Sequence, residues 1–419
     1  MKTIIYQVLP RCWKKGRFSD WDKASFDYVK SMGCTHIWFT GIPRHTSGKP
    51  WVKGTPGSPY AISNYFDVNP YLSDNEEKRM DEFKLLVKRC HKNGLKVLTD
   101  FVPNHIAPDY EDGRGGIPHY DWHDYDWSDT RKINYSAPET WRKMLDIVLF
   151  WAELGVDGMR CDMVELVDVA FFTFLTSEVK KRHHEFIFIA EVYDKGNYDR
   201  YIHQGGFDYL YDKSGIYDSL KAIMCCSAPV SLITGNWQSL GALQPYMLNF
   251  LENHDEQRLA SREFLGRGDK AYAALAVTAL FNNAAVLVYA GQESGENAEE
   301  SDNGRSSIFN ANTIMKAVDR KILKRYREIM SLAATPLFSE GGNWDLQYCN
   351  YESKGYDIER HFSFLRYDGK SCALVFCNFS DNFASAVVHI PEEAKQKCHP
   401  AKDDIDVSAA PWDVQIVFI

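Results

Sequence analysis

The chain has 419 residues, of which 45% are hydrophobic and 25% are charged. This is the balance of a folded globular protein, and it excludes a disordered chain, a collagen-like repeat and a coiled coil. Lys and Arg number 48 against 57 Asp and Glu, so the formal net charge is −9. An acidic chain is poorly suited to nucleic acid or to an anionic membrane surface, so we expect neither as a partner and favour a neutral ligand.

The sequence carries no sign of export or of membrane insertion. The N-terminal run MKTIIYQVLPRCW is apolar only as far as Pro10, without the long hydrophobic stretch and cleavage site of a secretory signal. The most apolar later stretch, 271–290, is interrupted by Asn282 and Asn283, which favours a buried helix and strand over a membrane span. The ten Cys are scattered and form no CxxC pair. These features predict a cytoplasmic protein with reduced thiols.

Strand-like and helix-like segments alternate over the first three quarters of the chain. Amphipathic stretches such as 22–32, 80–93 and 138–154 separate short β-branched or apolar runs. This alternation is typical of an α/β protein and predicts a (β/α)8 TIM barrel. The eight predicted strands are Thr3–Leu9, Thr35–Ile42, Lys96–Val102, Gly158–Asp162, Phe186–Val192, Phe207–Tyr211, Tyr246–Leu251 and Ala285–Ala290.

The pattern changes at two places. Residues 106–134 follow the third strand and are rich in Asp, Tyr, Trp and Gly without periodicity, which predicts a short insertion over the C-terminal face of the barrel. Past residue 335 the chain shows alternating strands, among them 361–367, 372–379, 384–390 and 414–419. We therefore expect a barrel domain over residues 1–334 and a C-terminal all-β sandwich domain over residues 335–419.

Polar side chains end several of the predicted strands, where barrels carry their functional residues. The third strand runs into Asp100, Asn104 and His105, and the fourth places Arg160 and Asp162 two residues apart, on one face. The fifth ends in Glu191, and the seventh leads to His254 and Asp255. Each residue alone is more often structural than functional, but together these residues place three acids at the C-terminal end of one barrel.

Such a set of acids is suited to glycoside cleavage, in which one carboxylate attacks the anomeric carbon and a protonated carboxyl donates to the leaving oxygen. Arg160 is predicted to hold Asp162 ionised, whereas the apolar neighbours of Glu191 favour its protonated form. Asp255 with His254 and His105 is predicted to bind sugar hydroxyls.

The motifs DFVPNH at 100–105, GMRCD at 158–162, AEV at 190–192 and NHD at 253–255 resemble those of the α-amylase family of retaining glycoside hydrolases, the family-13 type. IYQVLPR, YAISNYFDVNP, GGFDYLYD, YAGQE and GRSSIF extend the resemblance over most of the chain. It implies cleavage of α-1,4-glucosidic bonds in malto-oligosaccharides or starch-type glucans through a covalent glycosyl-enzyme intermediate. It also implies that Asp162 is the nucleophile, Glu191 the general acid/base and Asp255 the transition-state stabiliser, and that the substrate-binding residues are Tyr60, Asp100, His105, Arg160 and His254.

Two features bear on how far the resemblance extends. Many starch-cleaving members carry Lys-His after the nucleophile to bind the leaving side, but this chain has Glu165 and Leu166 there. The resemblance requires no cofactor, although many members bind a structural calcium ion through the residue that matches Asn104. The acids of the insertion are oxygen ligands of the right hardness for calcium, and a solvated acidic loop is the other interpretation.

Several alternatives stay open from the sequence. Tyr60 is either core packing or a stacking surface for a sugar, and Trp51, Trp122 and Trp127 either form outer sugar subsites or anchor irregular loops. The alternative activities are an α-glucan transglycosylase and an exo-acting α-glucosidase of the same family. A non-catalytic sugar-binding relative is disfavoured, because Asp162, Glu191 and Asp255 are all present. The oligomeric state is open.

Overall fold

The computed structural model describes residues 2–311, 314, 318–398 and 402–419. Its centre is a closed barrel of eight parallel strands, which confirms the predicted TIM barrel, and all eight strands lie within the predicted segments. Around the barrel the strand order is β1-β12-β11-β10-β9-β8-β5-β2. The bounds are Ile4–Val8 for β1, His36–Phe39 for β2, Lys96–Phe101 for β5, Gly158–Cys161 for β8, Ile187–Ala190 for β9, Tyr209–Tyr211 for β10, Met247–Phe250 for β11 and Ala285–Tyr289 for β12.

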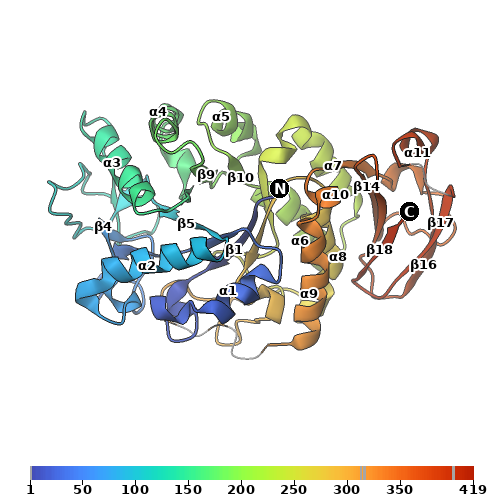
Figure 1. Ribbon diagram of the computed structural model, residues 1–419, viewed down its shortest axis with the longest axis horizontal. Coiled ribbons are helices and arrows are strands. Elements are labelled where there is room, and N and C mark those ends of the chain that lie inside the picture. The colour runs from blue at the N-terminus through green and yellow to red at the C-terminus, as the bar shows by residue number, and fades with distance from the viewer. Residues whose placement is uncertain (1, 312–313, 315–317, 399–401) are drawn as a thin grey trace.

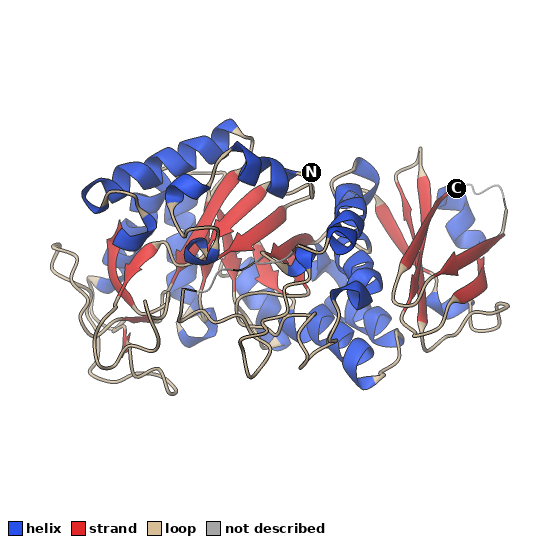
Figure 2. Ribbon diagram, turned by 90° about the horizontal axis from the view of Figure 1, so that it is seen from below, coloured by secondary structure: helices blue, strands red, loops and turns tan. Residues whose placement is uncertain are grey.

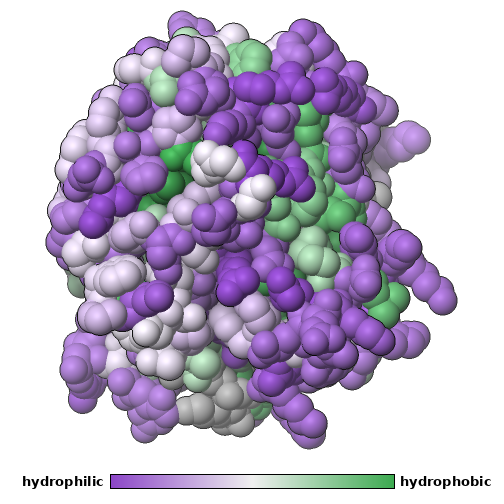
Figure 3. All heavy atoms as spheres, turned by 90° about the vertical axis from the view of Figure 1, so that its left-hand side faces the viewer, coloured by the Kyte–Doolittle hydropathy of each residue, from purple (hydrophilic) through white to green (hydrophobic). Residues whose placement is uncertain are grey.

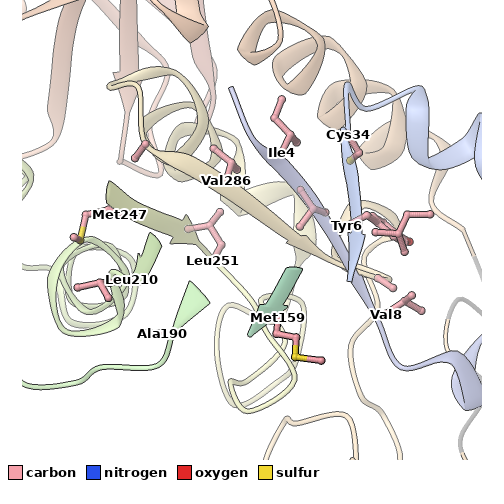
Figure 4. Packing of buried hydrophobic residues seen from close by; sticks show 14 of the residues in the cluster. Ile4, Tyr6, Val8, Cys34, Met159, Ala190, Leu210, Met247, Leu251 and Val286 are labelled. Carbon is pink, nitrogen blue, oxygen red and sulfur yellow. The ribbon is translucent and has the colours of Figure 1, made fainter. Parts of the chain in front are cut away.

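The barrel strands are buried on both faces because successive side chains alternate between the barrel interior and the surrounding helices. On β1, Ile4, Tyr6 and Val8 belong to the cluster between strands and helices, whereas Ile5 belongs to the interior cluster. Figure 4 shows this outer packing, with β1 and β12 side by side. At the start of β8 the chain passes so close to β9 that a Cβ on Gly158 would lie 2.5 Å from the Ile187 carbonyl oxygen. Only glycine fits there.

Helices surround the barrel, as the amphipathic stretches predict. Figure 2 shows the red strands flanked by blue helices, with long loops gathered below them. The helix α9 and the short α10 lie between the barrel and the C-terminal sheets (Figure 1). The helices are Lys23–Lys30 (α1), Arg79–Lys92 (α2), Thr140–Glu153 (α3), Val169–Lys180 (α4), Tyr198–His203 (α5), Asp218–Cys226 (α6), Ser231–Leu240 (α7), Tyr272–Leu280 (α8), Arg320–Ala333 (α9), Pro336–Ser339 (α10) and Glu392–Cys398 (α11).

Two long loops lie at the C-terminal ends of the barrel strands. The loop after β2 contains the antiparallel pair β3 (Pro43–His45) and β4 (Ile62–Val68). The segment after β5 contains the short pair β6 (His105–Ile106) and β7 (Arg131–Lys132), and the rest of it is irregular. Seen from the end of the molecule opposite the C-terminal sheets, the surface is mostly hydrophilic, with hydrophobic residues in patches (Figure 3).

The C-terminal part consists of two antiparallel sheets (Figure 1). Side chains of both sheets, among them Leu374, Phe376, Ala386 and Val388, share one hydrophobic cluster, as in a sandwich. The sequence analysis did not single out the outer strands β13 and β17. The four-stranded sheet comprises β13 (Gly342–Asp345), β14 (His361–Tyr367), β15 (Cys372–Asn378) and β18 (Val414–Phe418), and the two-stranded sheet comprises β16 (Ala384–His389) and β17 (Asp404–Ala409).

No helix within the described part of the chain is long and apolar enough to cross a membrane.

Candidate active site

A cavity of about 290 Å³ opens at the C-terminal ends of the barrel strands. It contains all three acids that the sequence singled out, although they are far apart in the chain. Residues of both long loops complete its wall. The lining residues are Lys53, Ser58, Tyr60, His105, Trp127, Asp129, Thr130, Asp162, Met163, Glu191, Tyr193, Asp255, Ile308 and Phe309.

The barrel brings the acids together because parallel strands end at the same rim. Asp162 directly follows β8 and Glu191 directly follows β9, its hydrogen-bonded neighbour. Asp255 lies in the loop after β11, where its backbone N–H donates to the Asn253 side-chain oxygen at 2.8 Å. Asp162 and Glu191 are buried, whereas 38% of the Asp255 side chain is exposed. The cavity is therefore open to a ligand on the Asp255 side.

One buried guanidinium connects the two buried acids. Arg160 donates from Nη1 to Asp162 Oδ1 at 2.6 Å, and its Nη2 lies 2.7 Å from Glu191 Oε1. The sequence analysis expected Arg160 to hold Asp162 ionised, and in the structure the guanidinium contacts both carboxyl groups because β8 and β9 are adjacent. The contact with Asp162 has hydrogen-bond geometry and the contact with Glu191 does not. Arg160 therefore favours the ionised form of Asp162 more specifically.

Glu191 is also held by two donors from neighbouring loops. The Tyr193 hydroxyl donates to Glu191 Oε1 at 2.8 Å, and the Met163 backbone N–H donates to Oε2 at 2.8 Å. Met163 reaches this position with a left-handed backbone, at a φ of 43°. A non-glycine residue rarely adopts such a conformation, and its place beside Asp162 is typical of functional sites.

Burial raises the pKa of all three acids. The Asp162 charge raises the pKa of Glu191 further, the Glu191 charge does the same for Asp255, and the positive charge of Arg160 opposes the rise in each case. For Glu191, a raised pKa favours the protonated form that a general acid requires. The direction for Glu191 agrees with the protonated resting form that its apolar neighbours predict.

His254 links Tyr60 to Asp255. Its ring stacks on Tyr60 at a centroid distance of 5.4 Å, and its Nε2 contacts both the Tyr60 hydroxyl and, at 3.0 Å, Asp255 Oδ2. The Gln7 side-chain nitrogen lies 2.7 Å from His254 Nδ1, which places the proton of the neutral ring on Nε2. Burial lowers the pKa of His254 well below its usual range, so the ring is neutral.

Asp100, Arg160 and His254 lie beneath the residues that line the cavity. Asp100 accepts from the Trp38 indole N–H at 3.2 Å, the Gly41 N–H at 3.3 Å and the Tyr60 hydroxyl at 3.4 Å. The structure therefore places these three residues where they orient Tyr60 and the acids. Tyr60 and His105 line the cavity directly, and burial lowers the pKa of His105 to about 4, which keeps its ring neutral.

Glu165 and Leu166, which stand where many starch-cleaving members carry Lys-His, have structural partners in this chain. Glu165 accepts from the Tyr193 N–H at 2.8 Å, the Asp194 N–H at 3.4 Å and the Asn197 amide at 2.7 Å. It thereby holds the loop that follows Glu191. The Leu166 carbonyl accepts from the Lys132 ammonium at 3.2 Å.

The oxygens around Asn104 do not fit a calcium ion in this structure, because the Lys132 ammonium lies among them. Lys132 Nζ donates to Asn104 Oδ1, to Asp124 Oδ2 at 3.1 Å and to the Leu166 carbonyl. Asn104 also donates from its amide nitrogen to Asp124 Oδ2 at 2.8 Å, so that oxygen is engaged twice. In the described ranges no group of three or more His, Cys, Asp or Glu residues is placed to hold a metal ion.

The sequence analysis did not identify Tyr193, Met163 or Lys132. Tyr193 had a usable signal, because an aromatic residue two positions after a strand-end acid lies on the same side of the chain as that acid. Met163 gave none, since its contribution is a backbone N–H. Lys132 pairs with His105 across β6 and β7, a contact between residues 27 positions apart that no local pattern predicts.

Comparison with known proteins places this site in a family. The α-amylase catalytic domain family matches residues 22–132 and 118–352. The α-amylase MalA of Haloarcula japonica is 26% identical over 325 residues, which cover 72% of this chain and 45% of that protein. A cyclomaltodextrinase of Thermoanaerobacter pseudethanolicus is 25% identical over 389 residues, covering 84% of this chain and 62% of that protein. The chain thus spans between 45% and 62% of the length of these two relatives.

Solved structures share the fold over the whole chain. A maltogenic α-amylase of Thermotoga neapolitana superimposes with a TM-score of 0.73 at 25% identity, covering 100% of this chain and 96% of that one. An α-amylase of Geobacillus thermoleovorans complexed with acarbose gives a TM-score of 0.78 at 18% identity, covering 99% and 98%. Given the family match over most of its length, this chain belongs to the α-amylase catalytic domain family.

Proposed function

We propose that this protein is a retaining glycoside hydrolase that cleaves α-1,4-glucosidic bonds in malto-oligosaccharides and starch-type glucans. The observation that carries the proposal is the contact of one buried guanidinium with two carboxyl groups, since Arg160 brings Asp162 and Glu191 to the same cavity. Asp255 lines that cavity too. The named relatives, an α-amylase and a cyclomaltodextrinase, support α-glucans as the substrate class.

In the first step an Asp162 carboxylate oxygen attacks the anomeric carbon of the bound glucose unit. The bond from that carbon to the glycosidic oxygen breaks, and Glu191 transfers its proton to the departing oxygen. Asp162 is then esterified to the sugar and Glu191 is a carboxylate. The Arg160 hydrogen bond suits Asp162 to attack because it favours the ionised form.

In the second step the Glu191 carboxylate takes a proton from water, whose oxygen attacks the anomeric carbon from the side that the leaving group vacated. The ester bond breaks and Asp162 returns as a carboxylate, so the product keeps the α configuration. Asp255, oriented by His254, stabilises the positive charge that develops at the sugar ring. The Tyr60 ring in the cavity wall packs against the apolar face of that sugar.

A transglycosylase is the second candidate, because it uses the same covalent intermediate and passes the sugar to another sugar. The relatives include an α-1,4-glucan:maltose-1-phosphate maltosyltransferase of Cereibacter sphaeroides, 29% identical over 228 residues. An exo-acting α-glucosidase would place the same acids at the end of a closed pocket.

We also propose a cytoplasmic location, supported by ten free cysteines, which a reducing compartment preserves.

A time course on maltoheptaose, with products separated by chromatography and the first anomer determined by proton NMR, tests the proposal. We expect shorter sugars released with the α configuration, and none from the Asp162→Asn variant. Early release of the β-anomer would contradict the retaining mechanism, and products longer than the substrate would favour the transglycosylase. Absence of reaction with maltoheptaose and with smaller α-glucosides would contradict the hydrolase.

A further inference from the structure

A single turn of π-helix, Lys213–Tyr217, follows β10 and contacts the loops after both neighbouring strands. The Ser214 hydroxyl donates to the Tyr193 carbonyl at 2.7 Å, in the loop after β9. The Tyr217 hydroxyl donates to Glu256 Oε2 at 2.8 Å, in the loop after β11. This segment, the β10 turn, therefore connects the two loops that follow β9 and β11.

The conformation of the β10 turn is specified by a glycine. A Cβ on Gly215 would overlap Asp212 Oδ1 and would lie 2.5 Å from Asn236 Oδ1, so no other residue fits there. Single π-helical turns are rare and occur frequently at functional sites. What the turn holds is therefore of interest for the reaction.

The β10 turn holds the Glu256 side chain, which is 10% exposed. One carboxylate oxygen accepts from the Tyr217 hydroxyl, and the Lys213 ammonium lies 3.5 Å from the other. The Tyr217 ring is fixed in turn, since it stacks on Phe250 of β11 at a centroid distance of 5.2 Å. Both oxygens of Glu256 thus have defined partners that the barrel positions.

Asp255 and Glu256 belong to one tight turn. The Asn253 side-chain oxygen accepts from the backbone N–H of Asp255 at 2.8 Å and from that of Glu256 at 3.0 Å. The Asp255 carboxylate contacts His254, whereas the Glu256 carboxylate contacts the β10 turn. Holding Glu256 therefore also holds the backbone that carries Asp255.

Ionisable groups face Asp255 from the ends of β8 and β9 and from its own loop. Those that carry charge are Glu191, Arg160, Asp162 and Glu256. Those that burial keeps uncharged, by lowering the pKa of the histidine and raising the pKa of each tyrosine, are His254, Tyr60, Tyr193, Tyr211 and Tyr289. Replacing a charged residue other than Glu256 would alter the other reacting groups. The effect of Glu256 on Asp255 can be isolated.

We propose that Glu256 and Lys213 are positioning residues for Asp255. Glu256 anchors the loop that carries Asp255, and the Lys213 ammonium offsets the Glu256 charge so that Asp255 acts as a carboxylate. The inference rests on the proposed function for the role of Asp255, because only an ionised carboxyl group stabilises positive charge at the sugar ring.

Titration of the Asp255 carboxyl by carbon-13 NMR, in protein labelled at the aspartate carboxyl carbons, tests the charge effect without substrate. The signal that disappears in Asp255→Asn identifies the group. Glu256→Gln should lower the pKa of Asp255 by about 0.5, because it removes a neighbouring negative charge. Lys213→Met should raise that pKa by about as much, because it removes the compensating positive charge.

Two further variants control the titration. Lys213→Arg keeps the positive charge and should leave the pKa of Asp255 within about 0.2 of wild type. Asp413→Asn is the matched control, because its ion pair with Arg325, at 2.8 Å, is also partly buried but lies in the C-terminal part. A Gln at position 256 can still accept from the Tyr217 hydroxyl, so that variant should fold, which its melting temperature checks.

The same variants are assayed on maltoheptaose over a range of pH. Activity falls as pH decreases through the pKa of Asp255. The acid limb of kcat/KM should therefore move to lower pH in Glu256→Gln and to higher pH in Lys213→Met.

Tyr217→Phe tests the anchoring of the loop without any change of charge. We expect kcat to fall about fivefold with KM within about twofold of wild type, since Asp255 acts on the transition state.

Shifts of the same sign in Glu256→Gln and Lys213→Met, or shifts no larger than in Asp413→Asn, would overturn the effect of charge. An unchanged kcat in Tyr217→Phe would overturn the anchoring role. If wild type does not cleave maltoheptaose, the proposed function fails, whereas the NMR titration still decides whether Glu256 and Lys213 act on Asp255.

Discussion

The Tyr193 hydroxyl donates a hydrogen bond of 2.8 Å to Oε1 of Glu191, the carboxyl group that we propose as the general acid. Among the groups in contact with Glu191, the Arg160 guanidinium and the Met163 N–H can only donate. A hydroxyl can donate to the carboxylate and accept from the protonated acid. Tyr193 can therefore remain hydrogen-bonded to Glu191 in both protonation states.

Tyr193→Phe should move the alkaline limb of the pH profile of kcat/KM upward. Activity falls as pH rises through the pKa of Glu191, and the Tyr193 hydrogen bond lowers that pKa by favouring the carboxylate. Its removal therefore raises the pKa, by about 0.7 unit for a bond of about 1 kcal/mol. Tyr209→Phe is the control, because that hydroxyl contacts Thr3, away from the cavity. If the alkaline limb of Tyr193→Phe stayed at the wild-type pH, it would contradict the role of Tyr193 in setting the pKa of Glu191.

Asp162→Asn should lower kcat by at least about a thousandfold, because an amide cannot form the ester intermediate. The fold should persist, since the Asn oxygen can still accept the hydrogen bond from Arg160 Nη1. Steady-state rates and the melting temperature measure the two effects separately. Retained activity in a folded variant would show that another residue is the nucleophile.

Glu165→Gln should reduce kcat about tenfold and the melting temperature by a few degrees. Glu165 accepts three hydrogen bonds from the loop that carries Tyr193, and a Gln amide group would face some of these donors with a donor of its own. Introducing Lys-His at positions 165 and 166 should reduce activity for the same reason.

Glu178→Gln on α4 serves as the control for Glu165→Gln, because Glu178 is half-buried and pairs with the exposed Lys181 at the surface. An increase in activity on grafting Lys-His would contradict the structural role of Glu165. It would support instead the expectation, from the sequence, that the leaving side is weakly bound.

EDTA should leave the melting temperature and activity of the wild-type protein unchanged, because Lys132 supplies the positive charge among the oxygens of Asn104, Asp124 and Leu166. Lys132→Met should lower stability by about 3 kcal/mol, since it leaves the Asp124 carboxylate with the Asn104 amide but without a cation. Added calcium should restore part of that loss.

Lys143→Met is the matched control for Lys132. Its ammonium also holds the insertion, by donating to the Gly115 carbonyl at 3.0 Å and the Gly116 carbonyl at 2.5 Å, but no acid is involved. Calcium should not stabilise that variant. A wild-type melting temperature that falls in EDTA would mean that a metal ion, not Lys132, holds this part of the chain.

The barrel was predictable because each of its strands is a short apolar run between amphipathic stretches, and the acids were predictable because they end those runs. The contacts that give the acids different roles were not predictable from the sequence. That Arg160 reaches Glu191 as well as Asp162 follows from the adjacency of β8 and β9, which only the closed sheet fixes. The environment of Asn104 depends on Lys132, which the pairing of β7 with β6 places beside it. The contact from Met163 depends on its left-handed backbone φ angle, which the sequence does not indicate.

The lysine between Asn104 and Leu166 has a consequence for how the site is assembled. A metal ion must be captured from solution and can be lost again, so the attachment of the insertion would follow the ion's availability. The Lys132 ammonium, in contrast, is covalently part of the chain, so it is present in every molecule. We therefore expect the wall of the cavity next to His105 to be complete as soon as the chain has folded, whatever the ionic composition around it.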